Sequence, residues 1–168
     1  MNVDAPSRDP IELAHRNWVA SGWADAADGM ALVTSIMRVQ QLLLADIEGV
    51  LRPHGLTFAR FELLRLLAFT RRGVLPVGKI GERLQVHPAS VTNAVQRLEE
   101  AGLVARRANP DDGRSVLAEI TPAGRDLAER CTLLLNERVF VTNPLGVRDV
   151  AETRRGLDLL RRHLGDAV

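Results

Sequence analysis

The sequence predicts a mainly α-helical fold that carries one small β-hairpin. Several stretches place apolar residues three and four positions apart, which is the spacing of one helix face. Between two of these stretches, short strand-like segments flank the run Asn109-Pro110-Asp111-Asp112-Gly113-Arg114, which is dense in turn-forming residues. Together these patterns predict helices on both sides of a single hairpin.

The overall composition is that of a globular protein. Hydrophobic residues make up 46% of the 168 residues and charged residues 26%, which excludes a disordered chain. The single cysteine, Cys131, excludes an internal disulfide framework. We expect no apolar run of membrane-spanning length and find no secretory signal pattern, so the sequence predicts a soluble cytoplasmic protein with no membrane partner.

The expected elements follow from apolar periodicity and from turn residues. Residues 1–10 are predicted to be a flexible tail, and Gly22 and Asn143-Pro144 are predicted breaks. The predicted helices cover residues 11–20, 30–51, 58–69, a short segment with Val77, Ile80 and Leu84, residues 88–101, residues 122–140 and residues 147–164. The predicted strands cover residues 103–107 and 115–120. Thr121 is a predicted helix cap, and Pro122 suits the first turn that follows it.

The helix around residues 88–100 is the most informative segment. Val91, Ala94, Val95 and Leu98 share one side of it. The other side carries Ala89, Ser90, Asn93, Gln96 and Arg97, with Thr92 at its edge. Pro88 suits the first helical turn, and Gly102 suits the C-terminal cap. Asn, Gln and Arg side chains can each make paired hydrogen bonds to base edges in the major groove of DNA.

The neighbouring segments indicate that this helix is part of a DNA-binding unit. A short helical segment precedes it, with only residues 85–87 between the two, and this is the layout of a helix-turn-helix. The hairpin that follows has arginines at its base and tip. Residues 52–114 carry 11 basic and 6 acidic side chains, although the whole chain has a net charge of only +1.

The stretch of residues 55–124 resembles the winged helix-turn-helix core of the MarR family of bacterial transcription regulators. The matching pieces are Gly55-Leu56-Thr57, the segment from Arg97-Leu98-Glu99 through Gly102-Leu103-Val104, the turn from Asn109 to Ser115, and Ile120-Thr121-Pro122-Ala123-Gly124. Their order and spacing make the resemblance specific. It implies a homodimer interlocked by its terminal helices, with two winged lobes that reach successive half-sites of double-stranded DNA.

The predicted DNA contacts combine the polar helix face with the wing. Ser90, Asn93, Gln96 and Arg97 are the candidates for base contacts, and Thr92 is a candidate for a phosphate contact. The free N–H groups at Pro88 and Ala89 suit a phosphate. Arg106 and Arg107 are expected to meet phosphates, or else to lie on a solvated strand edge. Arg114 resembles the family's minor-groove arginine and Asp112 the carboxylate that orients it; the alternative is a simple turn salt bridge between the two.

The resemblance also implies regulation by a small molecule. Many relatives lose DNA affinity when a small aromatic acid or phenol binds between the dimer helices and the winged lobe. Candidate ligand-binding residues are Trp18, Trp23 and Arg38. The alternatives are that the tryptophans dock a helix on the core, which is their more common role, and that Arg38 is an exposed or interface arginine. A redox sensor fits poorly, because Cys131 lies beside Leu133, Leu134 and Leu135 and is expected to be a buried apolar residue.

Other functional classes have little support. The run from Gly73 to Ile80 nearly matches a phosphate-binding loop, but Ile80 stands where a magnesium-binding hydroxyl is needed. The four histidines lack metal-ligand spacing, and no catalytic constellation is evident, so we expect no metal, no cofactor and no enzyme activity.

The sequence therefore predicts a mainly α fold with a small β-wing: a winged helix-turn-helix core flanked by N- and C-terminal dimerisation helices. The predicted parts are the tail 1–10, N-terminal helices 11–54, a DNA-binding domain 55–121 and C-terminal helices 122–168. The predicted function is a homodimeric, ligand-released repressor that binds a palindromic operator. The alternative is a protein-interaction module that retains the fold without specific DNA binding.

Overall fold

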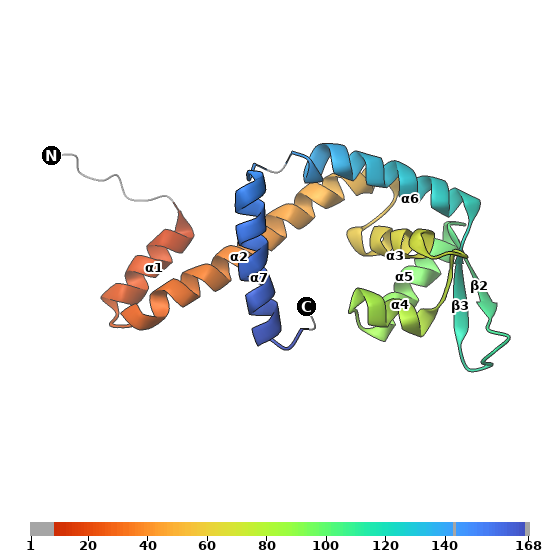
Figure 1. Ribbon diagram of the computed structural model, residues 1–168, viewed down its shortest axis with the longest axis horizontal. Helices are drawn as coiled ribbons and strands as arrows, with labels where there is room; N and C mark the ends of the chain where they lie inside the picture. Colours follow the sequence, from red (N-terminus) through yellow and green to blue (C-terminus); the bar gives the residue numbers. More distant parts are fainter. Residues whose placement is uncertain (1–8, 143, 167–168) are drawn as a thin grey trace. The chain divides into compact units, whose positions relative to one another are not determined.

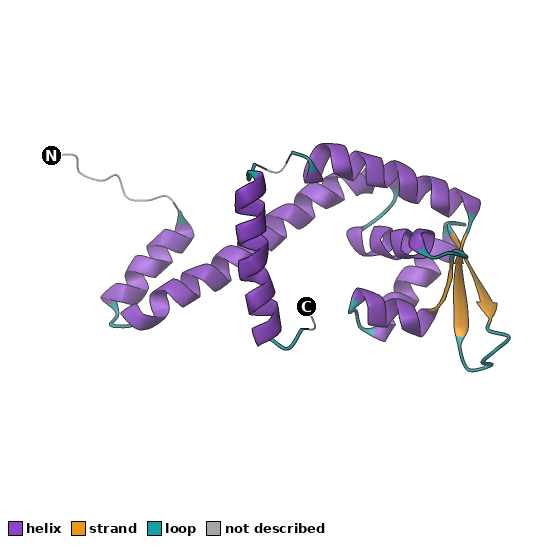
Figure 2. Cartoon of the chain, in the orientation of Figure 1, coloured by secondary structure: helices purple, strands orange, loops and turns teal. Residues whose placement is uncertain are grey.

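The computed structural model describes residues 9–142 and 144–166. The chain divides after Phe58 into two compact units. Helices dominate both units, and the described strands all lie in one small sheet of the second unit (Figure 2). The predicted fold class is confirmed.

The first unit contains α1 (Pro10–Ala20), α2 (Ala24–Leu51) and the 3₁₀ turn η1 (Arg52–His54) (Figure 1). The Asp9 carboxylate caps α1 by accepting a hydrogen bond of 2.9 Å from the Ile11 amide. Pro10 already belongs to the helix, so the predicted tail is one residue too long; residues 1–8 lie outside the described part. Gly22, with φ of +88°, separates the two helices as predicted.

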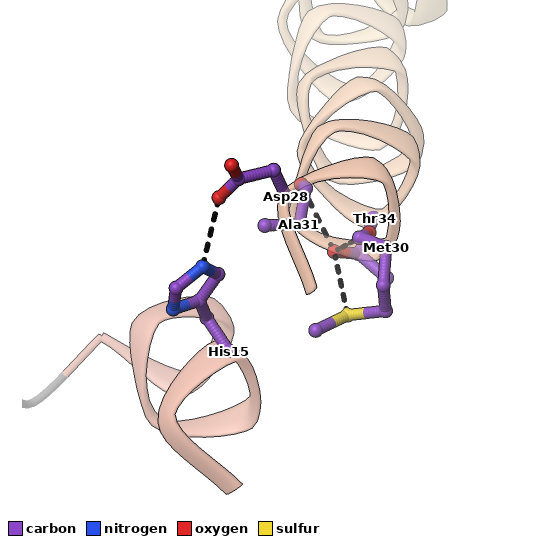
Figure 3. Close-up of polar contacts among 5 residues, drawn as sticks. All are labelled: His15, Asp28, Met30, Ala31 and Thr34. Atoms are coloured by element: carbon purple, nitrogen blue, oxygen red, sulfur yellow. Dashed lines mark hydrogen bonds and ion pairs between the residues drawn. The ribbon is translucent and has the colours of Figure 1, made fainter. Parts of the chain in front are cut away.

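Helix α2 begins six residues before the predicted start at Met30. The apolar stripe used for the prediction starts near Met30, whereas the preceding turns carry Asp25 and Asp28 on solvent-facing positions. Oδ1 of Asp28 lies 2.9 Å from Nε2 of His15 in α1, which is hydrogen-bonding distance, as Figure 3 shows. Figure 3 also shows Thr34, whose hydroxyl donates to the Met30 carbonyl at 2.8 Å. The contact with α1 thus extends the order of α2 beyond its apolar stripe.

Helix α2 exposes large apolar side chains around much of its circumference. They are Leu32, Val33, Met37, Val39, Leu42 and Leu43. The segment Ala24–His54 is long and apolar enough, by length and composition, to cross a membrane. An 18-residue stretch within it has a mean hydropathy of 1.3, and 6% of that stretch is buried. The expectation that no segment reaches such a length is therefore wrong: it considered uninterrupted apolar runs, whereas α2 intersperses Thr34, Ser35 and Gln40 along one continuous helix.

The second unit contains the helix-turn-helix, the sheet and the C-terminal helices. Its elements are α3 (Phe58–Phe69), β1 (Val74–Pro76), α4 (Val77–Leu84), α5 (Pro88–Glu100), β2 (Val104–Ala108), β3 (Val116–Ile120), α6 (Pro122–Leu135), the π-helical turn η2 (Asn136–Phe140) and α7 (Val147–His163). The predicted helices here are confirmed within a few residues at each end. Asn143, half of the predicted break before α7, lies outside the described residues.

The sheet has one more strand than the sequence predicts. Its order is β1-β3-β2, with all pairs antiparallel. Strand β1 has only three residues and ends in Pro76, so it shows no alternating pattern from which the sequence would predict a strand. It pairs with β3 from Val74 opposite Glu119 to Pro76 opposite Leu117. A strand this short is stabilised by its partner rather than by its own sequence.

The buried side chains of this unit come from α3, α4, α5 and α6 and from strands β2 and β3. Helix α3 contributes Leu63, Leu64 and Leu67. The other elements contribute Ile80, Val91, Val95, Leu98, Val104, Ala118, Ile120, Leu127, Ala128, Cys131 and Leu135. Thr121 caps α6 through a 3.0 Å hydrogen bond from the Gly124 amide, as predicted. The core therefore fixes α5 and the hairpin on the same framework.

Gly124 lies at a close approach between α6 and the loop before β2. A Cβ atom at this position would overlap the Leu103 carbonyl oxygen and would lie 3.0 Å from Cγ1 of Ile120. The Leu103 carbonyl also accepts a 3.0 Å hydrogen bond from the Thr121 amide, so it cannot move freely.

We expect Gly124→Ala to lower the free energy of unfolding by about 1–3 kcal/mol, the usual range for overpacking a core. Urea denaturation followed by circular dichroism measures the change. The matched control is Gly156→Ala in α7, where a Cβ meets nothing within 4 Å. The control should be neutral or stabilising, and an equal loss in both variants would contradict the close approach at Gly124.

Candidate nucleic-acid interface

The turn between α4 and α5 sets the direction of α5. Gln85 adopts a left-handed conformation with φ of 55°, and the Val86 amide donates to the Gly81 carbonyl at 3.2 Å. His87 caps α5, with its Nδ1 accepting from the Ala89 amide at 3.2 Å. Pro88 occupies the first helical position, as predicted. The chain thus reverses within three residues, as a helix-turn-helix requires.

Helix α5 has the two faces that the sequence predicts. Val91, Val95 and Leu98 are each at most 2% exposed and fix the helix to the core. The opposite face is exposed and carries the predicted contact residues Ala89, Ser90, Thr92, Asn93, Gln96 and Arg97. The structure therefore places these six residues on the solvent side of one helix. The Thr92 hydroxyl donates 3.0 Å back to the Pro88 carbonyl, and its oxygen can still accept.

The loop of the wing is ordered by its own polar groups. Asn109 donates through its side chain to the Ser115 hydroxyl at 2.7 Å, and its side-chain oxygen accepts from the Asp111 amide at 3.1 Å. The Asp112 carboxylate accepts from the backbone amide of Arg114 at 3.0 Å. Asp112 therefore positions the backbone of Arg114, and no ion pair joins the two side chains in the described structure. This differs from the expectation that the carboxylate orients the guanidinium, because the tight turn brings the amide to the carboxylate first.

The two arginines of β2 each pair with a carboxylate. Arg106 donates from Nε to Glu99 at 2.6 Å, and its backbone amide donates to the other oxygen of Glu99 at 3.3 Å. Arg107 lies on the other side of the strand and pairs with Glu119 of β3 at 2.8 Å. All four side chains remain at least one-third exposed. Pairs this exposed to water can be exchanged for phosphate contacts at low cost.

A groove joins α4, α5 and the wing. It has a volume of about 340 Å³ and is lined by Val77, Gly78, Thr92, Val95, Arg106, Arg114, Ser115 and Val116. The groove therefore brings Thr92, at the edge of the exposed polar face of α5, together with Arg106 and Arg114 of the wing. Arg107 lies instead in a separate hollow on the opposite side of the wing, together with Arg72 and Glu119.

The predicted ligand residues of the first unit fall into two places. Trp18 and Trp23 pack edge to face with ring centroids 5.4 Å apart, and Trp23 remains 56% exposed. Arg38 is 15 positions beyond Trp23, which is about 22 Å along the axis of α2. Arg38 is exposed and donates 3.4 Å to Gln41. Within one chain, α2 does not bring the cation to the tryptophan pair.

Sequence reasoning missed three carboxylates of this surface. Glu99, Glu100 and Glu119 hold four of the predicted contact residues: Gln96, Arg97, Arg106 and Arg107. The spacing of Arg97 and Glu100, three positions apart on one helix, was a signal that could have been used. Hydrogen bonds from Gln96 and Arg97 hold the pKa of Glu100 below its ordinary value.

The near-match to a phosphate-binding loop has a different structure. Three of the four residues between Gly73 and Gly78 form strand β1, and Lys79 pairs with Glu82 at 2.7 Å. A loop that cradles phosphate needs free amides in this segment, whereas β1 pairs with β3. No group of three His, Cys, Asp or Glu side chains able to hold a metal ion occurs among the residues that the structure describes.

Comparisons with known proteins place these features in a family. A family model described as MarR family matches residues 54–115. The HTH-type transcriptional repressor Rv2887 of Mycobacterium tuberculosis is 35% identical over 104 residues, which cover 62% of this chain and 73% of the relative.

Solved structures of MarR family regulators also resemble this chain. The MarR family regulator Sco5413 of Streptomyces coelicolor matches with 47% identity and a TM-score of 0.75, over 83% of this chain and 99% of that one. A mutant of MarR from E. coli, solved in complex with operator DNA, matches with 25% identity and a TM-score of 0.72, over 80% of this chain and 96% of that one.

Cys131 is buried in α6, and its burial raises the pKa of the thiol. A raised pKa means that less thiolate is present at pH 8 than in a free cysteine, whose pKa is about 8.5. We expect the native protein to react with a thiol reagent such as DTNB at least about 100-fold more slowly than the protein in 6 M urea, because the sulfur is both enclosed and protonated. Comparable rates in the two conditions would contradict the buried role.

Proposed function

Because the chain belongs to the MarR family of transcription regulators, we propose that it is a repressor that binds a palindromic operator in double-stranded DNA as a homodimer. The observation that carries the proposal is the exposed polar face of α5 beside an arginine-bearing wing. The prediction that the chain is not an enzyme is confirmed by its family, whose members are transcription regulators.

In this proposal α5 reads the bases and the wing adds backbone contacts. Asn93, Gln96 and Arg97 have the side chains that pair with base edges in the major groove, and Ser90 adds a short hydroxyl. The amide end of α5 at Pro88 and Ala89, together with Thr92, suits a phosphate. Arg106 and Arg107 exchange their carboxylates for phosphates, and Arg114, on the loop ordered by Asp112, enters the minor groove.

Homodimerisation is supported by the uncovered apolar side chains of α2. Six large apolar residues of this helix are at least 49% exposed. A second copy of the chain would bury them, and a two-fold symmetric dimer presents two α5 helices to half-sites about 34–36 Å apart. In this proposal residues 11–54 and 122–168 form the dimer, and residues 55–121 bind DNA.

Release by a small aromatic or lipophilic ligand is the proposed regulation. The Trp18–Trp23 pair, in which Trp18 is half-buried and Trp23 is exposed, offers an aromatic surface. Arg38 offers a cation for a ligand carboxylate, at a different point of α2. In a dimer the two features would belong to the same ligand site only if they came from different chains.

The test of the proposed function is fluorescence anisotropy of the purified protein on DNA selected by it from a random-sequence library, against scrambled DNA at physiological salt. A preference of about 10³-fold or more supports a sequence-specific regulator. Selection of no sequence, with equal weak binding to every duplex, would support the interaction-module alternative.

The same assay separates the roles of the helix and the wing. We expect Arg97→Ala to weaken operator binding by about 10- to 100-fold, the cost of one bidentate base contact, and to affect scrambled DNA much less. Arg114→Ala should weaken binding to the operator and to scrambled DNA. It should also reduce the slope of log K against log salt by about 0.9, the contribution of one phosphate contact. An equal loss on both duplexes for Arg97→Ala would contradict its role in base reading.

The dimer proposal predicts that Leu43→Glu yields a monomer, because the new carboxylate would have to be buried in the interface without a partner. Sedimentation equilibrium measures the mass. The matched control is Gln41→Glu, which adds the same charge about 160° around α2 from Leu43 and beside the Arg38 guanidinium, and it should remain a dimer. A wild-type monomer would refute the dimer, and recovery of the wild type in the membrane fraction would favour a membrane role for α2.

A further inference from the structure

The last residue of α5, Glu100, uses both of its carboxylate oxygens. One oxygen accepts from the Gln96 side-chain amide at 3.0 Å, and the other accepts from Nη1 of Arg97 at 3.1 Å. These two donors are predicted base contacts. The lowered pKa of Glu100 means that the group is a charged carboxylate at neutral pH.

Glu100 lies on the proposed DNA-binding face of α5. Asn93, Gln96, Arg97 and Glu100 follow one another at intervals of three and one residues, which keeps them on the same side of a helix. All four are exposed, and the Glu100 side chain is 49% exposed. A fixed negative charge therefore stands on a surface that would approach a polyanion.

The neighbouring Glu99 has a different role. It is less exposed, at 34%, and it binds both the side chain and the backbone amide of Arg106. Glu99 thus fastens β2 to α5, which is a structural link between two elements. The hydrogen bonds to the Glu100 carboxylate come from side chains of its own helix, and Arg106 of β2 adds an electrostatic attraction. Unlike Glu99, Glu100 accepts no backbone hydrogen bond that would join α5 to β2 in the described part of the chain.

We infer that Glu100 is a specificity-determining residue that holds Gln96 and Arg97 for base reading and penalises contacts made with phosphate alone. The inference rests on the proposed function. The Arg97 guanidinium has five N–H donors, of which Glu100 takes one, so the others can reach a base while the ion pair stays in place.

A complex with the wrong sequence lacks those base acceptors. Arg97 must then turn away to a phosphate, which breaks its pair with Glu100. The carboxylate is left unpaired beside the phosphates, and their like charges repel. The cost falls on non-specific binding and spares the operator complex, so Glu100 raises the ratio of the two affinities.

The experiment measures the dissociation constants of Glu100→Gln on the selected operator and on scrambled DNA across a salt series. Glutamine keeps the shape and can still accept a hydrogen bond, but it carries no charge. We expect affinity for scrambled DNA to rise about 3- to 10-fold, affinity for the operator to change by less than about 2-fold, and the salt dependence on scrambled DNA to steepen by up to about 0.9.

The matched control is Glu82→Gln on α4, an exposed glutamate that pairs with Lys79 at 2.7 Å. This variant removes the same charge from the same unit but not from the face of α5. Glu82→Gln should change the affinities for the operator and for scrambled DNA by a similar factor. If Glu100→Gln also changes the two affinities by a similar factor, and so leaves their ratio unchanged, the inference is overturned.

Two further readouts complete the design. Glu100→Gln should reduce the ratio of operator affinity to scrambled-DNA affinity less in an Arg97→Ala background than in the wild type. An equal reduction in the two backgrounds would show that Glu100 does not act through Arg97. Circular dichroism should show that each variant keeps its fold. If the wild type selects no DNA sequence, the proposed function fails and the inference fails with it; if the wild type is selective and only the Glu100 result is negative, the proposed function stands.

Discussion

The proposed interface depends on how α5 is buried. Val91, Val95 and Leu98 are almost completely enclosed, so the helix cannot rotate about its axis without exposing all three. This fixes which side chains face outward, and it does so before any nucleic acid arrives. The left-handed turn at Gln85 and the cap at His87 set where the helix starts. The polar face is therefore preorganised by apolar packing on the opposite side of the same helix.

Ion pairs order the charged side chains on the surface that packing positions. The second unit's basic surface is partly neutralised by its own carboxylates: Glu99 holds Arg106, Glu100 holds Arg97, and Glu119 holds Arg107. Each pair orders a long, flexible side chain and reduces the net positive charge that would attract any polyanion. A surface built in this way favours partners that can match the positions of its donors. Arg114, on a loop ordered by backbone contacts to Asp112, has no such carboxylate among the described residues.

The first unit shows the opposite balance, with apolar side chains left outside. The same helix that is long and apolar enough for a membrane is interspersed with Thr34, Ser35 and Gln40 and begins with Asp25 and Asp28. In the proposed homodimer, a second copy of the chain covers these apolar side chains. The unit's aromatic pair and its arginine are separated along α2, which sets a geometric condition on any ligand site proposed there.

The sequence by itself determined the features that depend on local interactions. Helix periodicity, the cap at Thr121, the proline in the first turn of α5 and the turn between residues 109 and 114 involve residues a few positions apart, so their chemistry is visible in the chain order. Only the tertiary structure decided the rest. Strand β1 exists because β3 pairs with it, Gly124 is required because the Leu103 carbonyl lies against it, and Arg107 meets Glu119 across two strands. These contacts join residues distant in sequence, and their energy is gained only after the chain has brought them together.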